Sequence, residues 1–230
     1  MASGPMSTGK MPPLEITYFD AGWGRADPIY QMLEHKGVEY TKATESFATW
    51  GPRKAAGKTA EFGALPIVKA GDKQFDCTIP VLRMLAMKLG YYPSNDWKKA
   101  ATTDMIAETW TDAFNAMVKP MIANDPAEQA DKIKYYEDSF ADQTGIMWKM
   151  FNLVNMALER SNGRFITGDT MSLGDFCMLT LIFNFVRNDA NPFSPVLKPL
   201  MEKKFPKVCS YADELAKEQS KYLNSAKRGK

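Results

Sequence analysis

Residues 62–93 read FGALPIVKAGDKQFDCTIPVLRMLAMKLGYYP, and this stretch determines the fold class of the first half of the chain. Two short runs, Leu65–Lys69 and Lys73–Asp76, flank the dipeptide Gly71-Asp72, a combination typical of an antiparallel β-hairpin. Thr78 then has the character of a helix cap. The apolar residues that follow recur at helical spacing: Val81, Leu82, Leu85 and Leu89. The stretch therefore predicts a hairpin followed directly by a helix.

The residues before this stretch extend the same pattern towards the N-terminus. Alternating apolar and polar residues in Leu14–Tyr18 predict a strand, and the next periodic segment predicts a helix with Pro28 in its first turn and Gly37 as its stop. Val38–Thr41 predicts a second strand, whereas 46–60 is interpreted as irregular or weakly helical. The order β-α-β-α-β-β-α favours a small mixed sheet with helices packed on it.

The second half of the chain lacks convincing strands and has the pattern of a helical bundle. One predicted helix face carries Met105, Ile106, Trp110, Phe114 and Met117, and another carries Met147, Met150, Phe151, Val154 and Leu158. Ser172 and Asp175 form a predicted capping box, flanked by Met171 and Phe176 as a hydrophobic staple. We divide the chain into a disordered lead-in 1–12, an α/β domain 13–93, an all-helical domain 96–225 and a basic tail 226–230.

Composition excludes several classes of function. The formal net charge of +2 gives no reason to expect a nucleic-acid partner. Three cysteines without metal-ligand spacing and one histidine, His35, exclude a disulfide framework, a histidine-based zinc site and a catalytic triad. The N-terminus has no apolar signal region, and the apolar stretch 179–186 is too short to span a membrane. We expect a protein of a reducing, intracellular compartment.

Four segments carry a resemblance to a known family. They are ITYFDAGWGRADPIYQMLEHKGVEY at 16–40, the stretch 62–93, TDMIAETWTDAF at 103–114 and ITGDTMSLGDFCML at 166–179. In this order they resemble the cytosolic glutathione transferases, most closely the sigma-like group, over about residues 12 to 222. The resemblance implies a thioredoxin-like N-terminal domain that holds glutathione and an all-helical C-terminal domain. Fold alone does not establish activity.

The resemblance assigns the catalytic role to Tyr18. A free thiol has a pKa of about 8.5, and a hydroxyl donor aimed at the sulfur favours its thiolate. Tyr18, followed by Phe19 in the glutathione site, matches the family tyrosine that supplies this donor; the alternative is an aromatic residue packed beside Leu14 and Ile16. Arg25 matches a family arginine near that tyrosine, where it would orient the hydroxyl or raise the local potential. Pairing with a nearby acid is the equal alternative for Arg25.

The resemblance also implies contacts to the two ends of glutathione. Trp50 and Lys54 match a pair that contacts the glycine end, although a surface tryptophan beside a loop lysine remains the alternative. Leu65 and Pro66 match a dipeptide whose proline is cis and whose backbone faces the cysteinyl unit of glutathione. Thr78, expected at a helix N-cap, would bind the γ-glutamyl carboxylate.

Asp112 completes this set from a second subunit. It aligns with the aspartate that reaches the γ-glutamyl amine across a dimer, so the implied site needs a homodimer. A solvated carboxylate on a helix face is the alternative.

Three departures from the family pattern bear on activity. There is one additional residue between Tyr18 and Arg25, Cys77 stands where Gln or Glu is usual, and Ala64 occupies a position often filled by Gln or Lys. Each missing polar contact would weaken glutathione binding by about 1 kcal/mol or more. Cys77 also suggests a separate hypothesis, a thiol of lowered pKa that forms a mixed disulfide with glutathione.

The leading hypothesis is a cytoplasmic glutathione S-transferase with glutathione as co-substrate. Its second substrate would be an apolar electrophile, conjugated or isomerised between Tyr18 and the segment Met105–Met117. The rival hypothesis is a non-catalytic relative that keeps the fold as an interaction protein or as a subunit of a larger assembly.

Overall fold

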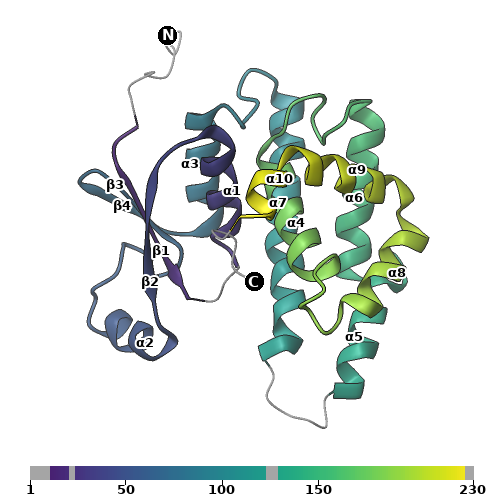
Figure 1. Cartoon of the computed structure of the whole chain (residues 1–230), viewed down its shortest axis with the longest axis horizontal. Coiled ribbons are helices and arrows are strands. Elements are labelled where there is room, and N and C mark those ends of the chain that lie inside the picture. Colours follow the sequence, from purple (N-terminus) through teal and green to yellow (C-terminus); the bar gives the residue numbers. More distant parts are fainter. Residues whose placement is uncertain (1–10, 21–23, 123–128, 226–230) are drawn as a thin grey trace.

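The computed structural model describes residues 11–20, 24–122 and 129–225. The predicted basic tail and most of the predicted lead-in lie outside these residues. A small sheet with its helices forms one half of the molecule, and a group of helices forms the other (Figure 1). Helices α1 and α3 lie between the sheet and the second half. The predicted fold class, a thioredoxin-like half followed by an all-helical half, is confirmed.

The sheet has four strands in the order β2-β1-β3-β4. They are β1 (Leu14–Phe19), β2 (Tyr40–Glu45), β3 (Ile67–Ala70) and β4 (Lys73–Phe75). Strand β1 is parallel to β2 and antiparallel to β3, and β3 is antiparallel to β4. The predicted hairpin is confirmed. The second strand is predicted to begin at Val38 but begins at Tyr40. The reason is that Val38 donates its N–H to the carbonyl of Leu33 at 2.9 Å and so closes the preceding helix.

The sheet half contains the helices α1 (Asp27–Lys36), α2 (Phe47–Ala55) and α3 (Thr78–Leu89). Gly37 ends α1 in a left-handed conformation, as predicted. Helix α2 lies in the segment 46–60, which is predicted to be irregular or weakly helical, and the helical alternative holds for Phe47–Ala55. None of its residues is buried, and its start is set by Ser46, whose side chain accepts the N–H of Thr49. Thr78 is the first helical residue of α3 and not its cap; the cap position belongs to Cys77.

Among the described residues the second half is built of helices, with one isolated β-bridge between Phe165 and Gly168. The helices are α4 (Trp97–Ile122), α5 (Gln129–Ala141), α6 (Ile146–Ser161), α7 (Leu173–Leu181), the π-helical segment η2 (Ile182–Val186), α8 (Ser194–Lys204), α9 (Pro206–Glu218) and α10 (Ser220–Leu223). The predicted apolar face of α6 is buried throughout. Of the five residues predicted on the apolar face of α4, Met105 is not buried. It is 51% exposed, because it lies about 100° around the helix from buried Ile106.

The predicted capping box at the start of α7 is confirmed. Asp175 is buried and accepts hydrogen bonds from the N–H and hydroxyl of Ser172, both at 2.7 Å, and from the N–H of Ile166 at 3.1 Å. Tyr211 of α9 donates a fourth bond to Asp175 at 2.7 Å. This carboxylate therefore joins three segments of the helical half.

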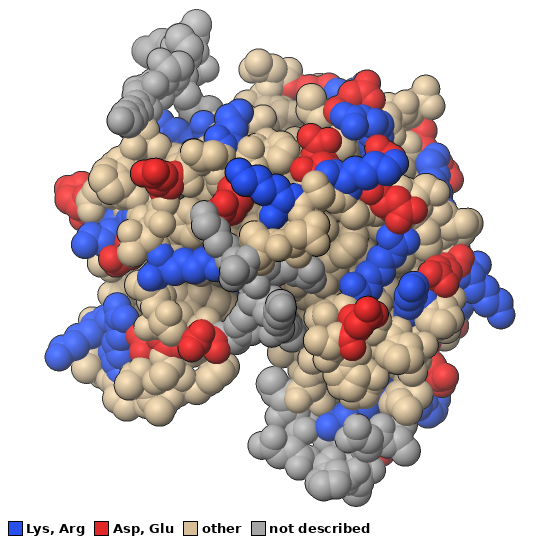
Figure 2. Space-filling view, in the orientation of Figure 1, with Lys and Arg blue, Asp and Glu red and all other residues tan. Residues whose placement is uncertain are grey.

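Basic and acidic side chains are mixed over the face seen in Figure 2, without a large area of one sign. No helix in the described parts of the chain is long and apolar enough to cross a membrane.

Candidate active site

The topology of the sheet collects most of the predicted site residues at one edge. Strands β2 and β4 run in the same direction as β1, so the chain leaves all three strands at the edge where Tyr18 lies. Pro66 stands directly before β3, whose first residue, Ile67, pairs with Thr17. The residues that follow β2 and β4 lead into α2 and α3 respectively. Tyr18, Leu65, Pro66, Thr78 and the helix with Trp50 and Lys54 therefore belong to the same edge.

The hydroxyl of Tyr18 is held by the main chain of the next loop. The backbone N–H of Arg25 donates to the Tyr18 hydroxyl oxygen at 3.0 Å. Because the oxygen accepts this bond, the hydroxyl hydrogen is left to donate elsewhere. Burial raises the pKa of Tyr18, and the bond from Arg25 opposes that rise. Tyr18 is thus a protonated donor at neutral pH.

Gly24 makes this contact sterically feasible. A Cβ atom on Gly24 would lie 2.6 Å from both Cε1 and the hydroxyl oxygen of Tyr18, well inside van der Waals contact. The backbone can therefore lie flat against the phenol ring only if residue 24 has no side chain. The sequence alone does not reveal this contact.

The side chain of Arg25 has a different role from its main chain. Its guanidinium contacts the Oδ1 atom of Asn115 on α4 and lies 5.9 Å from the centre of the Phe114 ring. The side chain thus links the sheet half to α4, and the predicted influence on the Tyr18 hydroxyl is exerted chiefly through the backbone. The positive charge of Arg25 also lowers the pKa of Tyr18.

Aromatic rings line the edge beside Tyr18. Phe19 stacks on Phe47 of α2, with ring centres 4.2 Å apart, and meets Trp50 edge-on at 6.3 Å. Phe47 is 75% exposed and is not recognised by sequence reasoning, because an exposed aromatic residue in a short helix has no diagnostic pattern. Glu45 at the end of β2 holds α2 in place by accepting hydrogen bonds from Thr49 and Arg53. These bonds lower the pKa of Glu45.

The loop before β3 is fixed by an acid that sequence reasoning missed. The peptide bond between Leu65 and Pro66 is cis. Asp76, which follows β4, accepts the backbone N–H of Phe62 at 3.0 Å and that of Ala64 at 3.2 Å. The stem of Lys54 runs beside Gly63 of the same loop, since a Cβ there would lie 3.8 Å from Lys54 Cγ. The structure therefore brings Lys54 to the loop that precedes Pro66.

The start of α3 offers backbone donors next to Thr78. The first amides of a helix have no acceptor within the helix and attract anions. Cys77, at the cap position, has a positive φ of 67° and a side chain that does not cap the helix. Burial and the negative charge of Asp76 raise the pKa of the Cys77 thiol, so the hypothesis of a lowered pKa at this cysteine is wrong.

Asp112 belongs to α4 and not to the sheet half that carries the other predicted site residues. It lies exposed on α4, and among the described residues no hydrogen bond or ion pair joins it to the other predicted site residues. A role that depends on a second subunit is compatible with this position.

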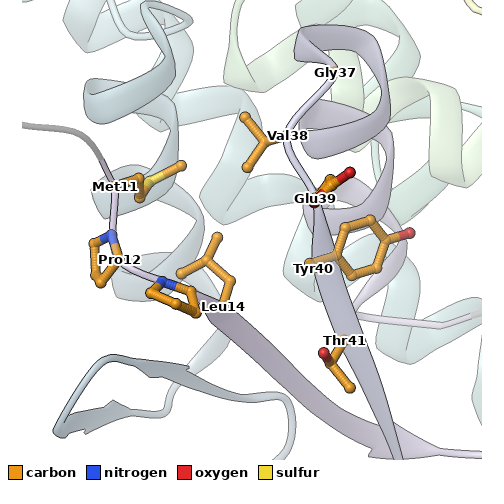
Figure 3. Close-up of a pocket in the computed structure, with 9 residues that line it drawn as sticks. Met11, Pro12, Leu14, Gly37, Val38, Glu39, Tyr40 and Thr41 are labelled. Atoms are coloured by element: carbon orange, nitrogen blue, oxygen red, sulfur yellow. The ribbon is translucent and has the colours of Figure 1, made fainter.

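A separate pocket of about 1020 Å³ lies at the opposite end of β1. Figure 3 shows it between the start of β1, with Met11, Pro12 and Leu14, and the segment Gly37–Thr41. The length of β1 puts it about 15 Å from Tyr18. It contains none of the predicted site residues.

Comparisons with known proteins agree with this geometry. The chain matches no family model. It is 26% identical over 219 residues to the class-mu 28 kDa glutathione S-transferase of Schistosoma japonicum, a match that covers 92% of this chain and 97% of the relative. It is 25% identical over 183 residues to glutathione S-transferase 4 of Caenorhabditis elegans, with 77% and 83% covered. Among solved structures it is similar to the sigma-class glutathione transferase of Fasciola hepatica, with a TM-score of 0.73, 21% identity, and 95% and 97% of the two chains covered.

Proposed function

Because this chain has the fold of the cytosolic glutathione transferases and is related to them in sequence over most of its length, we propose that it is a glutathione S-transferase that uses Tyr18 to activate glutathione. The reaction joins the sulfur of glutathione, its co-substrate, to an apolar electrophile or isomerises such a molecule. Detoxification in the cytoplasm is the setting that we propose for this chemistry.

The observation that carries the proposal is the hydrogen bonding of the Tyr18 hydroxyl. Its oxygen accepts the Arg25 N–H at 3.0 Å, so its hydrogen is free for a ligand. A hydrogen bond to an ionised group contributes about 1.5–3 kcal/mol, which lowers the pKa of a thiol by about one to two units. Such a shift would raise the thiolate fraction at pH 7 from about 3%, for a thiol of pKa about 8.5, to between about a quarter and three quarters.

We propose that the surrounding groups bind the rest of the tripeptide. Trp50 and Lys54 would bind the glycine carboxylate, and the backbone at Leu65 and Pro66 would pair with the cysteinyl unit. The donors at the start of α3, with Thr78, would receive the γ-glutamyl carboxylate. The side chain at the cap position makes no hydrogen bond to these donors, so they remain available to a ligand.

A sigma-like homodimer would complete the site through Asp112. The exposed carboxylate on α4 supports this proposal, because the γ-glutamyl amine needs an anionic partner. The second substrate would bind between Tyr18 and the part of α4 around Phe114 and Asn115, which Arg25 contacts.

The test is a pH titration of glutathione bound to the protein, followed by the ultraviolet absorbance of the thiolate. The native chain should show a bound thiol that titrates about one to two units below the free value of about 8.5. In Tyr18→Phe, which keeps the ring and removes the hydroxyl, the pKa should return towards that value. Absence of a saturable thiolate signal at millimolar glutathione in the native chain would refute the proposal.

A further inference from the structure

Two buried polar contacts join α1 to the helical half. The Asn184 side-chain amide donates to Asp27 Oδ2 at 2.6 Å, and the Gln31 amide donates to the Thr180 hydroxyl at 3.0 Å. All four side chains are at most 2% exposed. Burying polar groups in an apolar interface is costly unless they are paired, so each contact fixes the position of α1 against the helical half.

Asn184 is itself held firmly. It lies in the π-helical segment η2, a rare conformation that is frequently found at functional sites. Side chains from the following turn bind the carbonyls of this segment. The side-chain amide of Asn188 donates to the carbonyl of Asn184 at 3.1 Å, and that of Asn191 donates to the carbonyl of Phe185 at 2.7 Å. The hydroxyl of Ser194 donates to the carbonyl of Val186 at 2.7 Å. The amide of Asn184 is therefore a fixed donor.

Asp27 lies at the start of α1, within three residues of Gly24. Its backbone N–H donates to the carbonyl of Gly24 at 3.1 Å, and the residue after Gly24, Arg25, donates its N–H to the Tyr18 hydroxyl. A short turn therefore runs from the Asp27 carboxylate to the hydroxyl of Tyr18. A movement of Asp27 would be transmitted to the N–H that Tyr18 accepts.

We propose that Asn184 is a positioning residue for Tyr18, because it fixes Asp27 and thereby keeps the Arg25 N–H aimed at the Tyr18 hydroxyl. This inference rests on the proposed function only in giving Tyr18 its catalytic role. Among the described residues, the charged or titratable groups beside Tyr18 are Arg25, Asp27 and Tyr30. Arg25 lowers the pKa of Tyr18 and Asp27 raises it, so the placement of both depends on the same turn.

The proposal predicts a specific electrostatic effect. If the turn loses its anchor, Tyr18 loses the N–H that stabilises its ionised form. The pKa of Tyr18 should then rise by about half to one unit, the equivalent of one neutral hydrogen bond. The thiol of bound glutathione should shift in the same direction, because a less acidic hydroxyl is a weaker donor.

The experiment is an NMR titration of the full chain with isotope-labelled tyrosine, in which the signal missing from Tyr18→Phe identifies Tyr18. The test variant is Asn184→Leu, which keeps the volume and removes the donor to Asp27. The matched control is Thr180→Val, which removes the other buried contact one turn away. If Asn184→Leu does not fold, Asn184→Ser, whose hydroxyl is too short to keep the bond to Asp27, replaces it.

A rise in the pKa of Tyr18 in the Asn184 variant, with no change in Thr180→Val, supports the proposal. An unchanged Tyr18 pKa in a folded Asn184 variant would overturn it. So would equal shifts in both variants, because these would reflect a loosened interface and not a specific anchor. The titration needs no glutathione, so a failure of the native chain to bind glutathione refutes the proposed function separately.

Discussion

Replacing Gly24 with alanine tests how closely the loop must approach Tyr18. The added Cβ atom would lie 2.6 Å from Cε1 and from the hydroxyl oxygen of Tyr18, and 3.0 Å from Cζ. An ordinary contact between such atoms begins at 3.4 Å, so the backbone or the ring must move by about 0.8 Å. The ring sits at the end of β1 and is packed against Phe19, so we expect most of the movement in the loop.

The size of the effect follows from the hydrogen bond that this movement breaks. The Arg25 nitrogen is 3.0 Å from the Tyr18 oxygen, and a shift of about 0.8 Å takes it beyond hydrogen-bond distance. Loss of one neutral hydrogen bond corresponds to about 0.5–1.5 kcal/mol, or about half to one unit in the pKa of Tyr18. The pKa of the bound thiol should shift in the same direction by less, because a less acidic hydroxyl is a weaker donor. Gly24→Ala should therefore raise the thiol pKa by less than Tyr18→Phe does.

The assay is the pH titration of thiolate absorbance at saturating glutathione. Gly51→Ala is the matched control, since nothing lies within 4 Å of a Cβ at Gly51 and the residue lies inside α2. This control should leave the thiol pKa unchanged. If Gly24→Ala also leaves it unchanged, the backbone of the loop does not support Tyr18, and the reasoning from this contact is refuted.

Two further predictions concern stability and pH. Asp175→Ala should lower the free energy of unfolding by about 3–5 kcal/mol, because it leaves buried donors without their acceptor, whereas Tyr211→Phe should lower it by only about 1–2 kcal/mol. Chemical denaturation measures both changes. A loss below about 1 kcal/mol for Asp175→Ala would show that water replaces these bonds. For activity at saturating glutathione, kcat/KM for the electrophile should rise with pH as the bound thiol ionises. It should show no decline at any pH below 10, because burial raises the pKa of Tyr18 above its ordinary value of 10.0 and keeps the hydroxyl protonated. A descending limb below that pH, absent from Tyr18→Phe, would contradict this.

Local patterns predict much of the fold. Gly71-Asp72 predicts the hairpin because the two flanking runs can pair only across a tight turn. Ser172 and Asp175 predict the start of α7 because each satisfies backbone donors that a helix start leaves unpaired. Helix α2 is predicted only as one of two alternatives for 46–60, because it buries no residue and its position depends on Glu45, which contacts Arg53 from the end of a strand.

The candidate site is predicted in part. The resemblance selects residues that the sheet topology gathers at one edge, including Tyr18 and the cis Leu65–Pro66 bond. It does not reveal the groups that hold them, because these contacts join residues far apart in the chain. Asp76 fixes the loop of Ala64, and Asn184 reaches Asp27 across 157 positions. No sequence periodicity encodes such a pair.

The loop between Tyr18 and Arg25 shows why a side-chain match is an incomplete guide to this site. The family pattern expects one residue fewer there, and the insertion could have displaced Arg25. Its backbone N–H nevertheless reaches the Tyr18 hydroxyl at 3.0 Å, because Gly24 allows the backbone to lie against the ring. The guanidinium is directed instead to Asn115 on α4. The donor to Tyr18 is thus a main-chain group that any residue at position 25 except proline would supply, and the sequence requirement for it falls on Gly24.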